Sequence, residues 1–226
     1  MRFTGFPAGA FDFYEALAAD NSRTFWQANK ATYRTAVREP LDALLDELAD
    51  IGPFHVFRPH KDVRFSKDKT PYKDHQGAYS ESEGGAGFYI QLSASGLMAA
   101  TGYYAMATDQ LVRFREAVDS DGRGAEVAAI TAALVRRGYG VGAIGELKTA
   151  PRGYPRDHPR IDLLRRKGLM VSKSWERADW MSTRAVVRRI RDTWEGAAEL
   201  DAWLDTNVGP STLAPDDDEA GRFGPL

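Results

Sequence analysis

The stretch GFYIQLSASGLMAATGYY, residues 87–104, carries the pattern that decides the fold class. In its first half, apolar side chains occupy every second position, with Tyr89, Gln91 and Ser93 between them. Alternation with a period of two is typical of a half-buried strand. Ser95-Gly96 then predicts a tight turn into a second strand over 97–104. We therefore expect an antiparallel hairpin at the centre of the protein.

Helical spacing dominates the sequence on both sides of this hairpin. Apolar residues recur at helical intervals over 11–18, and Asn21 or Ser22 is placed to cap a second helix. A leucine stripe after Pro40 predicts a third helix. On the other side of the hairpin, we expect helices over 108–118, 125–137, 159–166, 183–194 and 196–208.

The remaining signals complete an α+β prediction. Short alternating runs at 54–58 and 62–66 predict two further strands, and 169–173 is β-prone. The Ser-, Glu- and Gly-rich residues 79–87 predict a loop, and the glycine-rich residues 138–142 predict a turn rather than a phosphate-binding loop. We predict a single domain, with a mostly antiparallel central sheet flanked by helices.

The predicted domain spans residues 1–209, and residues 210–226 are predicted to be a disordered acidic tail. The tail contains the four consecutive acids of 216–219 and few apolar side chains, so burial cannot offset the entropy cost of ordering it. The chain of 226 residues is 43% hydrophobic, which is enough for a sizeable core. The sequence contains no repeats.

Composition excludes several kinds of chemistry. The chain has no cysteine, which rules out disulfides, thiolate zinc sites and cysteine nucleophiles. The four histidines show no zinc-type spacing, so we predict neither a metal nor a cofactor. No apolar run of about 18 residues is present, and the N-terminus lacks a secretory pattern. We therefore expect a cytoplasmic protein without a membrane partner.

Charge is unevenly distributed along the chain, although the formal net charge is only −2. Residues 58–75 contain six Lys and Arg against three Asp, and residues 148–191 contain thirteen against four acids. The rest of the chain carries the opposite excess. If the fold brings the two basic segments together, they form a basin that concentrates anions. The alternative is that these cations pair with the acidic excess elsewhere.

The first basic segment offers the most specific candidate site. In the predicted strand 62–66, Asp62 and Arg64 share one face, away from Val63 and Phe65. Arg64 offers a planar fork that suits a carboxylate or a phosphate, and Asp62 could orient it. Alternatively, the two residues only close a sheet edge. Tyr72 adds a hydroxyl and a stacking surface.

The leading hypothesis is a basic cleft that binds a phosphorylated or carboxylated small molecule. Its predicted ligand-binding residues are Arg58, Asp62, Arg64, Lys69, Tyr72, Arg152 and Tyr154. If the protein is an enzyme, we expect metal-independent transfer or hydrolysis. Arg64 and Lys69 would then stabilise developing negative charge, and Tyr72 or His158 would move a proton.

Two other classes of function remain open. Nucleic acid could bind the same basin, with Trp175 and Trp180 stacking on bases. The sequence pI near 6.1 argues for weak binding or none, because dedicated nucleic-acid binders are usually basic. A third possibility is a protein-interaction module that offers its basic surface to an acidic partner.

The basic segment also resembles a known family. Arg58, Asp62, Arg64, Phe65, Asp68, Lys69 and Tyr72 fit the pattern R-x-x-R-D-x-R-F-x-x-[DN]-K-x-x-Y, with Lys61 in place of the second Arg. This pattern is similar to that of the bacterial family called domain of unknown function 2461. Residues 25–33, 111–118 and 148–167 are also similar to blocks of that family. The resemblance implies a single domain, and the family has no assigned activity, substrate or catalytic residues.

Overall fold

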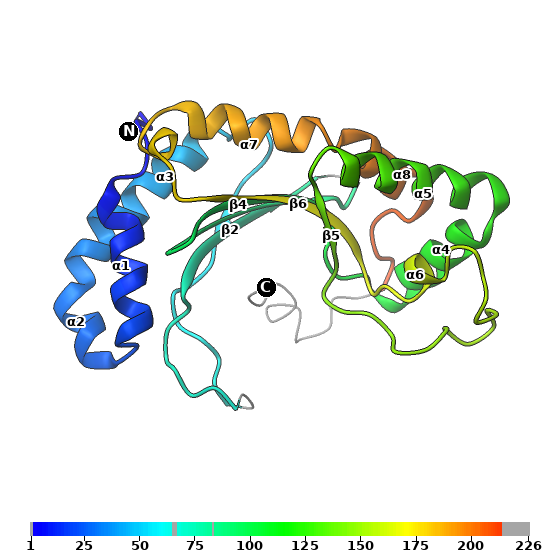
Figure 1. Ribbon diagram of the computed structural model, residues 1–226, viewed down its shortest axis with the longest axis horizontal. Helices are drawn as coiled ribbons and strands as arrows, with labels where there is room; N and C mark the ends of the chain where they lie inside the picture. The colour runs from blue at the N-terminus through cyan, green and yellow to red at the C-terminus, as the bar shows by residue number, and fades with distance from the viewer. Residues whose placement is uncertain (1, 65–66, 83, 214–226) are drawn as a thin grey trace. The chain divides into compact units, whose positions relative to one another are not determined.

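The computed structural model describes residues 2–64, 67–82 and 84–213. Its strands form one antiparallel sheet in the order β1-β2-β3-β4-β6-β5 (Figure 1). The strands are β1 (His55–Val56), β2 (His75–Glu81), β3 (Gly87–Ser93), β4 (Gly96–Tyr103), β5 (Gly140–Gly142) and β6 (Leu169–Glu176). Together with the helices described below, this sheet confirms the α+β prediction.

The hairpin that decided the fold class is present. β3 and β4 are joined by a two-residue turn at Ala94-Ser95, and β4 begins at Gly96. Gly96 has φ +138°, and a Cβ at this position would lie 2.1 Å from the carbonyl oxygen of Trp175. Only glycine combines this backbone conformation with so close an approach.

Contacts divide the chain into two compact units. The first unit comprises Met1–Ser80, Tyr89–Ala99 and Ser174–Asp192. The second unit comprises Glu81–Phe88, Ala100–Lys173 and Thr193–Leu226. The two basic segments are distributed accordingly: residues 58–75 belong to the first unit, and most of 148–191 belongs to the second.

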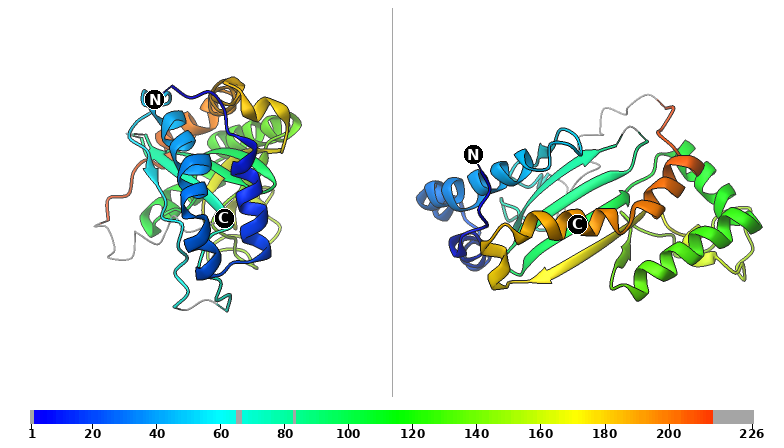
Figure 2. Two further views of the ribbon diagram at one scale, coloured as in Figure 1. Left: turned by 90° about the vertical axis from the view of Figure 1, so that its left-hand side faces the viewer. Right: turned by 90° about the horizontal axis from the view of Figure 1, so that it is seen from above.

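The first unit begins with α1 (Ala8–Ala19) and α2 (Arg23–Thr32), which run side by side (Figure 2). Ser22 caps α2, because its hydroxyl oxygen accepts a hydrogen bond from the backbone N–H of Phe25 at 3.1 Å. α2 continues through a π-helical segment, η1 (Tyr33–Arg38), into α3 (Glu39–Asp46). Pro40 lacks the N–H of a regular helical turn, and the wider π-helical turn directly precedes it.

In the same unit, helix α7 (Ala185–Glu195) follows the 3₁₀ turn η2 (Asp179–Ser182) and lies over one face of the strands (Figures 1 and 2). Ala78, Ile90 and Leu92 are buried on that face, together with the polar Gln76 and Ser80 of β2. Tyr79 and Tyr89 on the opposite face are only partly buried. The alternation that predicted a half-buried strand therefore separates a helix-covered face from a more open one.

The second unit is a helical layer around its own apolar core. It contains α4 (Thr108–Asp119), α5 (Asp121–Arg136), the short α6 (Ile161–Leu164) and α8 (Ala198–Asn207). Phe114, Val127, Leu164 and Trp203 pack in one buried cluster with residues of β4 and β6. The amphipathic patterns that predicted these helices supply this core.

Three local predictions were wrong. Residues 61–64 are not a strand, because the carboxylate of Asp62 accepts a hydrogen bond from the backbone N–H of Arg64 and turns the chain; Phe65 and Ser66 lie outside the described residues. β2 was missed and partly assigned to a loop. β5, predicted as a turn, is an edge strand that pairs with β6. The glycines and small residues of β2 and β5 give little β propensity, so pairing with neighbouring strands decides both.

The predicted tail lies mostly outside the described residues, since the structure describes the chain only to residue 213. Of the residues just after Pro210, Ser211 and Thr212 hydrogen-bond to the carboxylate of Asp109. The guanidinium of Arg113 donates to the carbonyl oxygens of Val208 and Pro210. This end of the second unit is therefore attached to α4.

Candidate functional site

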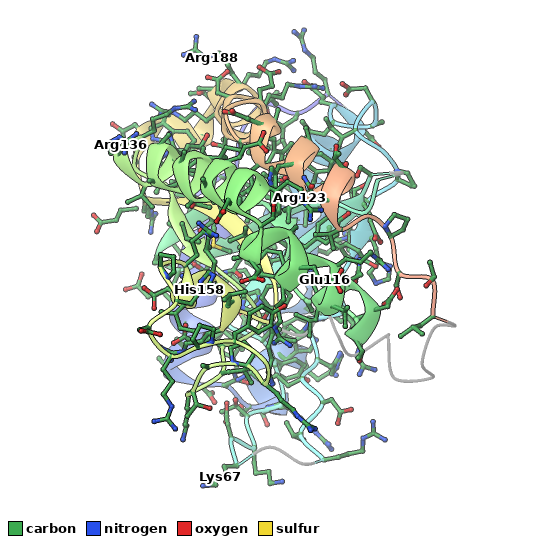
Figure 3. All side chains as sticks on the ribbon, turned by 90° about the vertical axis from the view of Figure 1, so that its right-hand side faces the viewer. Lys67, Glu116, Arg123, Arg136, His158 and Arg188 are labelled. Atoms are coloured by element: carbon green, nitrogen blue, oxygen red, sulfur yellow. The ribbon has the colours of Figure 1, made fainter. Side chains whose placement is uncertain are left out.

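The basic segment of the first unit forms two antiparallel arms that extend from the sheet (Figure 1). The backbone N–H of Lys73 donates to the carbonyl oxygen of Pro59 at 2.8 Å, and that of Lys61 donates to Pro71 at 2.9 Å. His60 and Tyr72 form an isolated antiparallel bridge between the arms. Lys67 lies at the far end of the arms (Figure 3).

Most charges near the far end of the arms are engaged within the segment itself. Arg64 binds Asp62 with both its Nε and Nη2, the latter at 2.6 Å from a carboxylate oxygen. Lys61 Nζ lies 2.7 Å from Asp68, and Lys69 Nζ donates to the carbonyl oxygen of Val63. The hydrogen bonds from Arg64 lower the pKa of Asp62 to about 2. A ligand of Arg64 would therefore have to compete with Asp62.

Tyr72 fixes the base of the arms. Its ring is 3% exposed and stacks on Trp26, with 4.3 Å between ring centroids and 10° between the planes. Asn21 holds its backbone from both sides, accepting from the N–H of Tyr72 at 3.1 Å and donating to its carbonyl oxygen at 3.0 Å. The stacking surface that the sequence predicted is thus used by another aromatic side chain of the same unit.

Lys73 follows Tyr72 directly and is in a different situation from the other cations. It is 8% exposed, and its Nζ lies 4.8 Å from the centroid of the Phe57 ring. Its pKa is lowered, first by burial and then by the charge of Arg58. Within the described residues, neither Lys73 nor Arg58 forms an ion pair with a carboxylate. Two neighbouring cations therefore lie here without a paired acid.

His75 is the next buried polar residue along the chain. It is 4% exposed, and its Nδ1 lies 2.7 Å from a carboxylate oxygen of Asp74. Burial lowers the pKa of His75, and Asp74 opposes that effect. The charges of Lys73 and Lys61 lower the pKa further. His75 is thus held largely neutral in a basic environment.

Aromatic rings line the partly buried face of the sheet next to Lys73. Phe57 and Tyr79 are stacked, with 5.4 Å between centroids, and Tyr89 lies 6.3 Å from Phe57. A Cβ on Gly77 would lie 2.6 Å from the hydroxyl oxygen of Tyr89 and 3.1 Å from a ring carbon of Phe57. Glycine at this position lets the two rings close over the strand.

The predicted residues of the second basic segment belong to the second unit. His158 lies in the irregular segment before α6 (Figure 3). Its Nδ1 accepts a hydrogen bond from the backbone N–H of Arg160 at 3.0 Å, and its Nε2 lies 3.2 Å from Asp119. Both ring nitrogens are therefore engaged. Tyr154 packs on the core of this unit, and Arg152 is exposed on a turn.

Two arginines in and next to α7 bind acids of other elements. Arg184, just before the helix, binds Glu47, and Arg191 in the helix binds Asp50. Trp175 and Trp180 pack edge to face, with Arg189 over Trp180 at 4.4 Å. These cations and rings join parts of the first unit to one another.

A family model now identifies the chain's relatives. The model described as "conserved hypothetical protein (DUF2461)" matches residues 9–203, which is most of the sequence. The chain belongs to this family. The resemblance seen in the basic segment is thereby confirmed. A search of curated proteins and a search of solved structures found no match.

The family match contains every residue of the candidate site, since Arg58, Lys73 and His75 all lie within 9–203. Its description states no activity, so the chemistry has to be argued from the residues. Among the described residues, no group of three or more His, Asp or Glu could hold a metal ion. None of the described helices combines the length and apolar character needed to cross a membrane.

Lys73 and His75 were not predicted as site residues. Lys73 was counted among the charges of the basic segment, and nothing in the local pattern distinguished it from Lys67 or Lys69. The distinguishing feature is burial, which arises because β2 begins at His75 inside the sheet. From the sequence, this burial could have been predicted only by assigning strand β2 correctly.

Proposed function

We propose that the protein binds a phosphorylated or carboxylated small molecule through Lys73 and Arg58 in its first unit. The observation that supports this proposal is the burial of Lys73 next to Arg58 without a paired carboxylate among the described residues. We also predict that Arg64, Lys69 and Tyr72 of the same segment contact the ligand. The ligand-binding roles of Arg152 and Tyr154 and the proton-transfer role of His158, all in the second unit, remain predictions.

The energetics favour a ligand over a purely structural role. Partial removal of the Lys73 side chain from water disfavours its charged form, which is why burial lowers its pKa. The contact between Lys73 and the ring of Phe57 would return only about 0.5–2 kcal/mol. Arg58 adds repulsion rather than attraction. A bound anion would offset this penalty, because buried charges are generally paired with an opposite charge.

Replacing Lys73 by methionine tests the proposal. Lys73→Met keeps the length of the side chain and removes the charge, so we expect a melting temperature at least as high as that of the wild type. We also expect it to lose the stabilisation that a bound anion gives. A ligand at 100 times its Kd stabilises a protein by about 2.7 kcal/mol. The measurement is thermal unfolding with inorganic phosphate and a panel of phosphorylated and carboxylated metabolites, at constant ionic strength.

Lys67→Met is the matched control, because Lys67 is an exposed lysine of the same segment. It should respond to the ligand as the wild type does. Arg58→Gln should weaken the response, and Arg64→Ala should weaken it less, because Arg64 is bound to Asp62. An equal rise in melting temperature for Lys73→Met and wild type would refute the site. So would a panel in which no anion stabilises the wild type.

A further inference from the structure

The four histidines differ in what their ring nitrogens contact. His55 and His60 are exposed, and His158 has both nitrogens engaged. His75 is buried and uses Nδ1 for Asp74, while its Nε2 forms no hydrogen bond within the described residues. A neutral imidazole that donates through Nδ1 keeps a lone pair on Nε2. His75 is therefore the histidine best placed to take up a proton.

The charged and titratable groups around His75 are known from several elements. Asp74 contacts it directly, and the charges of Lys73 and Lys61 act on it from the two arms. From α1, the pKa of Tyr14 is raised by burial, then by Tyr33 and by the charge of Asp74.

We propose that His75 is the third donor of the anion site, and that it takes up one proton when a doubly charged tetrahedral anion binds. This inference rests on the proposed function and narrows its ligand class to a phosphate monoester or a similar dianion. Lys73, Arg58 and protonated His75 supply three cationic groups, which suits an anion with three terminal oxygens. A monocarboxylate offers only two oxygens and one charge.

Proton uptake by His75 is coupled to anion binding because burial keeps the free imidazole neutral. Burial, together with the charges of Lys73 and Lys61, disfavours the imidazolium form more than Asp74 favours it. A dianion reverses that balance, and Asp74 holds the ring in place during the change. By linkage, a proton that strengthens anion binding is itself bound more tightly when the anion is present. The proton moves from solvent to Nε2, and no covalent bond to the ligand forms.

Sulfate is the probe for this inference, because it remains a dianion throughout the relevant pH range. Calorimetric titration should show that sulfate binds more tightly as the pH falls, by up to tenfold per pH unit for one linked proton. Repeating the titration in buffers of different ionisation enthalpy should show proton uptake by the protein. Imidazole-ring NMR should show a higher pKa for His75 with sulfate than without it.

Three variants separate the possible outcomes. His75→Gln should retain weaker sulfate binding that no longer depends on pH near neutrality, whereas His55→Gln should behave like the wild type. Lys73→Met should lose binding at every pH. Binding that requires Lys73 but shows no pH dependence would overturn the role of His75 and leave the proposed function intact. A pH dependence that persists in His75→Gln would also overturn it. Absence of sulfate and phosphate binding in the wild type would overturn both.

Discussion

Replacing Tyr72 by alanine is expected to lower the free energy of unfolding by about 3–5 kcal/mol, as for other large buried aromatic side chains. The ring is 3% exposed and stacks on Trp26 at 4.3 Å, so its removal leaves a cavity at the base of the two arms. The melting temperature should fall by on the order of 10 °C. Chemical denaturation of wild type and variant would measure the change.

Tyr72→Phe is the control that separates packing from chemistry. It keeps the ring against Trp26 and removes only the hydroxyl, so we expect near-wild-type stability. Its response to anions then tests whether the hydroxyl contacts the ligand. If Tyr72→Phe abolished anion binding without unfolding the protein, the hydroxyl would have the role that the sequence predicted. If Tyr72→Ala were as stable as wild type, the stacked arrangement with Trp26 would be incorrect.

The second large effect concerns Asp201 in the second unit. This residue of α8 is 8% exposed, and one carboxylate oxygen accepts a hydrogen bond from the hydroxyl of Thr101 at 2.7 Å. Its other oxygen is buried without a hydrogen bond among the described residues. Burial raises the pKa of Asp201 to about 7, the hydrogen bond from Thr101 opposes this, and Asp205 adds to it. The ordinary value is 3.8.

The direction in which the free energy of unfolding changes with pH follows from the raised pKa of Asp201, about 7, and its ordinary value, 3.8. Between about pH 4 and about pH 7 the folded state keeps a proton that the unfolded state has lost, so stability falls as the pH rises. Each unit of difference in pKa corresponds to about 1.4 kcal/mol. Asp201→Asn should therefore raise the free energy of unfolding by up to about 4 kcal/mol at about pH 8. It should have little effect below about pH 4.

Urea unfolding of wild type and Asp201→Asn across this pH range measures the effect. The difference between the two proteins should grow with pH and level off above neutrality. Asp205→Asn, four residues further along α8, is a comparison, because Asp205 is less buried and accepts a hydrogen bond from Tyr103. A constant difference between wild type and Asp201→Asn at all pH values would show that the carboxyl of Asp201 titrates normally.

The proposed site also changes how the charge pattern is understood. The sequence shows two basic segments and suggests one basin, but the residues of the second segment with the clearest contacts are engaged within their own unit. His158 binds Asp119, and Arg184 binds Glu47. An excess of cations in a segment does not show which of them are paired. Lys73 differs from its neighbours because it is buried beside Arg58 without a paired acid among the described residues.

The sequence by itself determined the features that depend on neighbours a few residues apart. The alternation in 87–93 and the turn signal Ser95-Gly96 predicted the central hairpin, whose turn lies one residue earlier, at Ala94-Ser95. Asn21 or Ser22 was predicted to cap α2, and Ser22 does so. The same kind of signal failed at 62–64, because a hydrogen bond between Asp62 and Arg64 turns a chain whose pattern favours a strand. The family motif was also readable, because it is a linear pattern of side chains.

Only the tertiary structure decided which polar residues are buried. β2 carries glycine and small residues, so its place inside the sheet depends on β1 and β3 rather than on its own propensity. That placement buries Lys73 and His75 and separates them from Lys67 and Lys69. Asp201 likewise meets Thr101 across 100 positions of sequence. Desolvation and pairing depend on such distant contacts, so the site and its pKa shifts could not be predicted from local patterns.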